Sequence, residues 1–153
     1  MEPKLRIGAL ISGGGSNLQA IIDACEGGRV DGRVVFVGAD NPAAKGLGRA
    51  ERHAIPTFVV DYGAVMRATR RPNGPLPPAD FNLEEVVAKQ ALFPKSRDPD
   101  EVARFFTSRA VVESRLLAAM AGFDCDLLVL AGFMRNLSPY FIDRVNTVPG
   151  EPR

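Results

Sequence analysis

Apolar residues gather in four short runs, separated by stretches with helical spacing. The runs lie at residues 5–11, 33–38, 55–60 and 126–132. Because nearly every position of each run is apolar, the runs indicate strands buried on both faces, as in a parallel sheet. The segments 16–26 and about 43–53 show the spacing of amphipathic helices. This alternation predicts an α/β fold with a doubly wound parallel sheet and right-handed crossovers, in which 126–132 is a central strand.

A glycine turn, Gly13–Gly15, joins the first predicted strand to the first predicted helix. Glycines admit positive φ and let a ligand approach the backbone. The free N–H groups and the dipole of the following helix favour an anion, most often phosphate. The turn lacks the lysine of a P-loop, and Leu18 occupies the place of the third glycine of a dinucleotide fingerprint. The glycines alone leave open a phosphate site or a tight turn without a ligand.

Two further helix starts can be read from capping residues. Asp98 as N-cap, Pro99 at the first position and Glu101 at the third predict a helix that stops near Gly122. Whether it is one helix or two remains open at this point. The pair Ser138-Pro139 predicts another short helix.

Composition narrows the class of protein. A chain of 153 residues fits one domain with a real core, and its net charge of +1 favours neither nucleic acid nor a membrane as a partner. No apolar run is long enough for a membrane helix, and the N-terminus has no signal-peptide core. Cys25 and Cys125 are expected to be reduced, buried thiols of a cytoplasmic protein. The single histidine, His53, is expected to face solvent, and we expect no metal.

The residues from Gly13 to Ile21 (GGGSNLQAI) carry a stronger signal than the glycines alone. They resemble the N-terminal signature of glycinamide ribonucleotide formyltransferases, which are folate-dependent enzymes of purine synthesis. The resemblance implies that Gly15, Ser16 and Asn17 hold the substrate phosphoribosylglycinamide. The chemistry agrees, because backbone amides, a hydroxyl and a side-chain amide can all donate to a phosphate. Ser16 can also serve as the N-cap of the helix.

Two other segments resemble the same family, namely Phe106–Arg109 and Ala131–Pro139. The resemblance implies a Rossmann-like N-terminal formyltransferase domain and a second ligand, the formyl donor 10-formyltetrahydrofolate. The residues implied to bind it are Arg109, Met134, Arg135, Asn136 and Leu137. The four from Met134 onward would line the pterin pocket, largely through backbone and apolar contacts. Asn136 departs from the apolar residue that the family has at this position. The alternatives to ligand binding are that Arg109 lies on the surface of a helix and that Met134 lies in the core.

Residues 62–99 interrupt the strand and helix alternation. Four prolines between 72 and 78, with Asn73 and Gly74, are typical of irregular structure. Asp80 is expected to cap a short helix over residues 83–87. We interpret 62–99 as an insertion within a single domain, 1–153. Its arginines either contact a phosphate or a polyglutamate tail, or lie on a solvent-exposed surface loop.

The reaction that the resemblance implies is attack of the substrate amine on the formyl carbon. The family stabilises the resulting oxyanion with an Asn and a protonated His of an Asn-x-His-Pro segment, assisted by an Asp. No residue of this chain corresponds to these three, so we assign no catalytic residue. We expect a truncated N-terminal part, inactive alone, whose fourth strand lacks a neighbour. A C-terminal half and a homodimer partner are both open as partners.

Two other functions compete with this interpretation. Another folate-dependent formyltransferase or hydrolase would share the fold and the folate half, without the Gly-Ser-Asn-Leu-Gln pattern. A non-catalytic phosphate-binding module would explain the missing catalytic residues.

Overall fold

The chain forms two compact units in a computed structural model that describes residues 5–146. The sheet unit comprises Met1–Tyr62 and Ala119–Arg135, and the helical unit comprises Gly63–Ala118 and Asn136–Arg153. Each unit is formed by segments that are far apart in the sequence.

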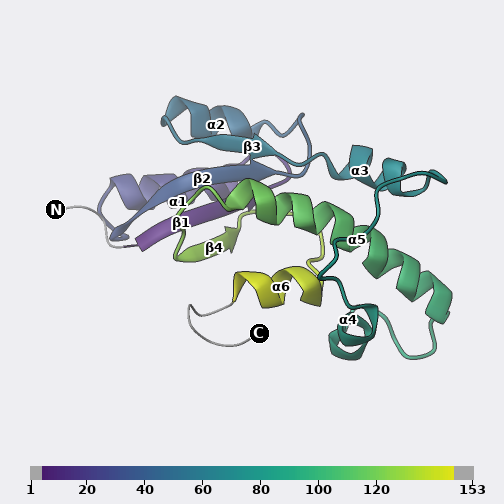
Figure 1. Cartoon of the computed structure of the whole chain (residues 1–153). Coiled ribbons are helices and arrows are strands. Elements are labelled where there is room, and N and C mark those ends of the chain that lie inside the picture. Colours follow the sequence, from purple (N-terminus) through teal and green to yellow (C-terminus); the bar gives the residue numbers. More distant parts are fainter. Residues whose placement is uncertain (1–4, 147–153) are drawn as a thin grey trace. The chain divides into compact units, whose positions relative to one another are not determined.

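Four parallel strands form the sheet unit's core (Figure 1). They are β1 (Leu5–Ile11), β2 (Gly32–Ala39), β3 (Thr57–Val59) and β4 (Leu127–Leu130). Their order in the sheet is β3-β2-β1-β4. The chain therefore moves outward from β1 to β3 and then returns to the other side of β1. This confirms the predicted doubly wound parallel sheet.

Two helices pack on one face of this sheet. They are α1 (Ser16–Glu26) and α2 (Gly46–Arg52), so α2 begins later than the predicted start near Ala43. The core between these helices and the sheet is made of small and branched apolar side chains, Ala9, Ile11, Leu18, Ile22, Val37, Ala39, Ala44, Ala50 and Ala131. Ala9 and Ile11 of β1, and Val37 and Ala39 of β2, thus face α1 and α2 at the two-residue period of a strand.

The opposite face of the sheet carries aromatic rings. Phe36 lies with its ring centroid 5.4 Å from that of Phe58 and 5.0 Å from that of Phe123. A Cβ atom on Gly8 would overlap the Phe36 ring, and one on Gly38 would overlap the Phe58 ring. The glycines of β1 and β2 therefore make the space in which these rings pack.

The prediction that 126–132 is a central strand is wrong for the part of the sheet that is described. There β4 pairs only with β1 and lies at the sheet edge. Leu127 and Leu130 are 46% and 49% exposed. A continuous apolar run indicates that both faces of a strand are apolar. Whether the strand is central or lies at the sheet edge depends on how many neighbouring strands it bonds to, which the run does not indicate.

The helical unit contains most of four helices, α3 (Tyr62–Thr69), α4 (Leu83–Lys89), α5 (Pro99–Met120) and α6 (Pro139–Val145) (Figure 1). Helix α3 was not predicted, because the prolines that follow it dominate the local pattern. Helix α4 was expected, but its cap is Asn82, which accepts from the Glu85 N–H at 3.1 Å. Asp80 instead accepts hydrogen bonds from the Tyr140 hydroxyl and the Arg144 Nε, each at 2.9 Å.

Helix α5 is a single helix of 22 residues. Its predicted start is confirmed, since the Asp98 carboxylate accepts from the Asp100 N–H at 3.0 Å. The Ser108 hydroxyl donates back to the Phe105 carbonyl at 2.9 Å, a bond that helices tolerate. The helix therefore continues past Thr107, where the sequence left a break open.

Both cysteines are free thiols, as expected, but each is only half-buried. Burial and the neighbouring Glu26 charge raise the pKa of the Cys25 thiol, which keeps it protonated and unreactive. None of the helices among residues 5–146 combines the length and apolar character needed to cross a bilayer.

Candidate functional site

The glycine turn after β1 is fixed from one side by α2. The Gly46 N–H donates to the Gly13 carbonyl at 2.9 Å, and the Arg49 Nε donates to the Gly14 carbonyl at 2.7 Å. Gly15 is the N-cap of α1 with φ +78°, so Ser16 is the first residue of the helix and not its N-cap. The structure thereby corrects the capping role and leaves the Ser16 hydroxyl available to a ligand.

The other side of the turn is open. A Cβ atom on Gly13 or Gly14 would meet nothing within 4 Å, and Ser16 and Asn17 are exposed. Neither of these two side chains donates or accepts a hydrogen bond within the described part of the chain. An anion can therefore approach the first N–H groups of the 11-residue helix α1 without displacing a protein group.

The loop after β4 lies beside this turn. Gly132 has φ +76°, and a Cβ atom placed on it would lie 3.8 Å from the Asn17 Nδ2. The Met134 N–H donates to the Ser12 hydroxyl at 2.8 Å. Met134 is 80% exposed, so the alternative of a core Met134 is wrong. The carboxyl ends of β1 and β4 thus meet where the strand order reverses, which is where open α/β sheets bind ligands.

A buried carboxylate holds the end of this loop. Asp40, which directly follows β2, is 2% exposed and accepts from the Arg135 Nε at 2.7 Å. The Arg135 guanidinium also lies 5.1 Å from the centroid of the Tyr62 ring. Asn41 donates to the Ser12 carbonyl at 2.8 Å. The charge of Arg135 is therefore matched within the protein, and what its loop offers a ligand is mainly backbone.

Ser12, Asp40 and Asn41 were missed in the sequence, although a signal for them exists. Each is a polar residue within three positions of the end of an apolar run. Parallel strands bring such residues to one edge of the sheet. Which of them touch could not be read from the chain, because that depends on the order of the strands.

The remaining predicted site residues belong to the helical unit. Asn136 is exposed and Leu137 is half-buried, just before α6. Arg109 lies on α5, is half-buried and has its guanidinium 4.9 Å from the centroid of the Phe105 ring. A free surface arginine is therefore not an adequate description of it. Its role and those of Asn136 and Leu137 stay predictions.

The segment that contains Asn136 and Leu137 is anchored by a buried acid. Glu113 of α5 is fully buried and accepts from the Ser138 N–H at 2.8 Å and from the Ser138 hydroxyl. Burial raises the pKa of Glu113, against these bonds and the positive charges of Arg109 and Arg144. The folded protein therefore holds this proton more tightly than the unfolded chain does.

Glu113→Gln is expected to remove a pH dependence of stability. In the wild type this contribution is fully present below the ordinary value of 4.5 and is lost as pH rises through the raised folded pKa. The free energy of unfolding of the variant should therefore increase relative to that of wild type as pH rises, by at most about 1.4 kcal/mol per pH unit. Urea unfolding over this range measures it. A difference between Glu113→Gln and wild type that stays constant over this range would contradict the prediction.

His53 does not face solvent freely, as was expected. Its Nδ1 lies 2.7 Å from the Glu26 carboxylate and its Nε2 lies 3.2 Å from the Gln19 Nε2, so it ties α2 to α1. Among residues 5–146, no group of three or more histidine, cysteine or carboxylate side chains is placed to hold a metal ion.

Comparison with known proteins points to one family. Phosphoribosylglycinamide formyltransferase of Escherichia coli is 31% identical to the chain over 138 residues, 90% of this chain and 46% of the relative. The enzyme of that name from Saccharomyces cerevisiae is 30% identical over 146 residues, 94% of this chain and 55% of the relative. The chain thus spans about half the length of these curated relatives.

Solved structures agree. Phosphoribosylglycinamide formyltransferase of Coxiella burnetii superimposes with a TM-score of 0.61 and 29% identity, covering 93% of this chain and 47% of that one. The Brucella melitensis protein of that name gives 0.60 and 27% identity, covering 94% and 53%. A formyltetrahydrofolate deformylase of Pseudomonas putida, 17% identical, shares the fold alone. Residues 5–148 match the sequence model of the formyl transferase family, and the chain therefore belongs to that family.

Proposed function

We propose that the chain contributes the substrate-binding and folate-binding part of an enzyme that transfers a formyl group from 10-formyltetrahydrofolate to the amine of phosphoribosylglycinamide. The observation that carries this proposal is the open glycine turn beside the loop after β4, at the point where the strand order reverses. Family membership supports formyl transfer, and the names of the relatives support this substrate.

The phosphate of the substrate is assigned to the start of α1. The Gly15 and Ser16 amides would face it, and the Ser16 hydroxyl and Asn17 side-chain amide would add neutral donors. The helix dipole adds favourable potential at this end. Because α2 already holds the turn, little ordering is needed on binding, which favours affinity.

The formyl donor is assigned to the segment Met134–Leu137, with Arg109 as a further contact. Exposed backbone next to an exposed Met134 side chain suits a flat pterin ring, which needs both hydrogen bonds and apolar contact. The folate supplies the formyl carbon at the oxidation level of formate. The residues assigned here bind and orient the two reactants, and none of them is assigned a proton-transfer role.

Isothermal titration of the 153-residue chain with phosphoribosylglycinamide tests the substrate assignment. Ser16→Ala with Asn17→Ala is expected to weaken binding about 100-fold, since each donor to a charged phosphate is worth roughly tenfold. Ser96→Ala with Asn73→Ala removes the same groups from exposed positions elsewhere and should leave the dissociation constant unchanged.

A second titration, with a folate analogue, tests the formyl donor. Binding of both ligands supports formyl transfer. Binding of the nucleotide with no folate analogue bound would instead favour a phosphate-binding module. Equal affinity of the wild type and the Ser16/Asn17 double variant would refute the substrate assignment.

A further inference from the structure

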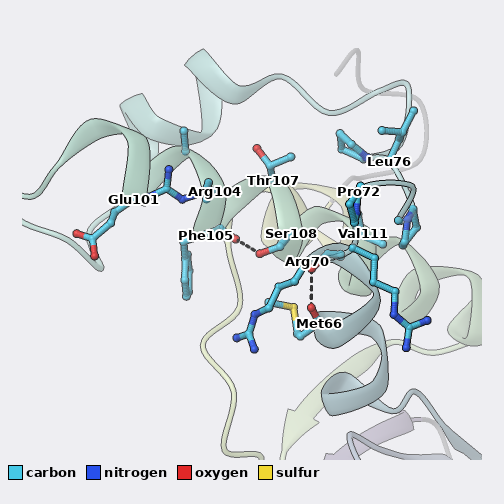
Figure 2. Close-up of a pocket in the computed structure, with 16 residues that line it drawn as sticks. Met66, Arg70, Pro72, Leu76, Glu101, Arg104, Phe105, Thr107, Ser108 and Val111 are labelled. Carbon is cyan, nitrogen blue, oxygen red and sulfur yellow. Dashed lines mark hydrogen bonds between the residues drawn. The ribbon is translucent and has the colours of Figure 1, made fainter.

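A large open pocket lies in the helical unit, formed by the part of the chain interpreted as an insertion together with α5. Its volume is about 840 Å³. Figure 2 shows residues of α3, of the proline-rich segment after it and of α5 between Glu101 and Val111 around one hollow. None of the residues assigned to the substrate or to the folate lines it. One of its walls, Phe105, contacts Arg109, so the pocket adjoins one of the assigned folate contacts without containing it.

The charged side chains of the pocket are mostly cationic. Arg70, Arg71 and Arg104 line it and are exposed. Within residues 5–146, no carboxylate lies at ion-pairing distance from these three guanidinium groups. The one acidic lining residue, Glu101, lies 3.8 Å from Arg97, which is outside the pocket. The pocket thus presents uncompensated positive charge in the form that binds phosphate and carboxylate best.

The walls between these arginines are apolar. Met66, Phe105 and Val111 come from the two helices, and Pro72 and Leu76 come from the segment between them (Figure 2). Leu76 is 84% exposed, so its side chain is free to contact the apolar part of a ligand. The prolines restrict the backbone of this wall, so less ordering is required on binding.

Two of the lining hydroxyl groups are already used inside the protein. Thr69 donates to the Met66 carbonyl at 2.7 Å, and Ser108 donates to the Phe105 carbonyl at 2.9 Å (Figure 2). Within the described part of the chain, the polar groups of the pocket that carry no such internal bond are the three arginines and the Thr107 hydroxyl.

We propose that this pocket is a second ligand site, which takes a small organic molecule with an apolar body and at least two anionic groups. The volume falls in the range of small-molecule pockets, about 300–1,000 Å³. The arginines bind the phosphate or carboxylate groups, and Leu76, Phe105 and the prolines cover the apolar body. Inorganic anions lack that body and bind less well.

Three probes test this ligand class by isothermal titration: adenosine triphosphate, the peptide Phe-Glu-Glu-Glu and inorganic tripolyphosphate. At least one of the first two is expected to bind at least about tenfold more tightly than tripolyphosphate. Which one binds decides between phosphate and carboxylate as the anionic group. The triple variant Arg70→Ala, Arg71→Ala, Arg104→Ala should weaken that binding by at least about 30-fold, and Leu76→Ser by a few-fold.

A matched control separates this site from general attraction by positive charge. Arg29→Ala, Arg52→Ala and Arg115→Ala remove the same charge from exposed positions outside the pocket and should leave affinity unchanged. An equal loss in the control, equal affinity for tripolyphosphate, or no binding of either organic probe would each overturn the proposal. The Ser16→Ala, Asn17→Ala variant should retain probe binding; loss there would place the probe at the glycine turn instead.

Discussion

Gly15→Ala is expected to destabilise the protein by roughly 3–5 kcal/mol and to abolish phosphoribosylglycinamide binding. Two costs add. Gly15 has φ +78°, where an L-residue costs about 1–2 kcal/mol. The new Cβ atom would also lie 2.7 Å from the Gly46 Cα atom, and backbone cannot rotate away. The turn would have to separate from α2 and would no longer aim its N–H groups at one point.

Two other glycines provide controls for this prediction. Gly28 has φ +77° but nothing within 4 Å of its Cβ position, so Gly28→Ala should show only the conformational cost, about 1–2 kcal/mol. Gly14→Ala has neither cost and should change stability by less than about 0.5 kcal/mol. Urea unfolding measures all three. If Gly15→Ala lost no more stability than Gly28→Ala, the contact between the turn and α2 would not constrain the site.

Asp40→Ala is expected to destabilise the protein by about 2–3 kcal/mol and to weaken folate-analogue binding about tenfold. The carboxylate is 2% exposed, and its removal deprives Arg135 of its acceptor and Asn41 of one of its two. Because Arg135 is 35% exposed, water solvates part of its charge in the variant. The loss of stability is therefore smaller than for a fully buried ion pair. The loop around Met134 would lose its ion pair and keep the hydrogen bond from the Met134 N–H to the Ser12 hydroxyl.

Hydrogen exchange measures the loss of stability, and calorimetric titration measures the affinity for the folate analogue. The amides of residues 132–135 should exchange faster in Asp40→Ala, while phosphoribosylglycinamide affinity changes little. Asp40→Asn keeps the shape of the side chain and one acceptor oxygen. Its stability and its affinity for the folate analogue should lie between those of wild type and Asp40→Ala. Glu101→Ala, which breaks an exposed ion pair, should cost under about 1 kcal/mol. Lower stability with unchanged folate affinity would limit Asp40 to a structural role.

Because Ser12 and Asp40 lie at the ends of neighbouring strands, the phosphate turn and the folate loop share one support. Ser12 accepts from the Met134 N–H through its hydroxyl and from Asn41 through its carbonyl. A change at Ser12 therefore reaches both proposed ligand sites, whereas Asp40 holds the folate loop directly and reaches Ser12 only through Asn41. Affinities for the two reactants are expected to be coupled, as packed networks of this kind usually are.

Local sequence signals were reliable where the physical cause is local. The run Leu5–Ile11, the helix after Gly15 and the cap at Asp98 formed as expected, since apolar continuity, helical spacing and capping act within a few residues. Helix α3 was missed because it has only eight residues, so the prolines that follow it dominate the local sequence pattern. The cap of α4 was misplaced, because Asp80 and Asn82 are equally good caps in isolation.

The sequence by itself determined the parallel α/β fold, the glycine turn and the family resemblance of the segments that carry Gly15, Ser16 and Asn17. Only the tertiary structure decided that β4 lies beside β1, that Gly15 must have no side chain because Gly46 contacts it, and that buried Asp40 holds Arg135. The physical reason is range. Propensity and periodicity act along the chain, whereas strand order, close backbone approach and the pairing of buried charges depend on residues distant in sequence.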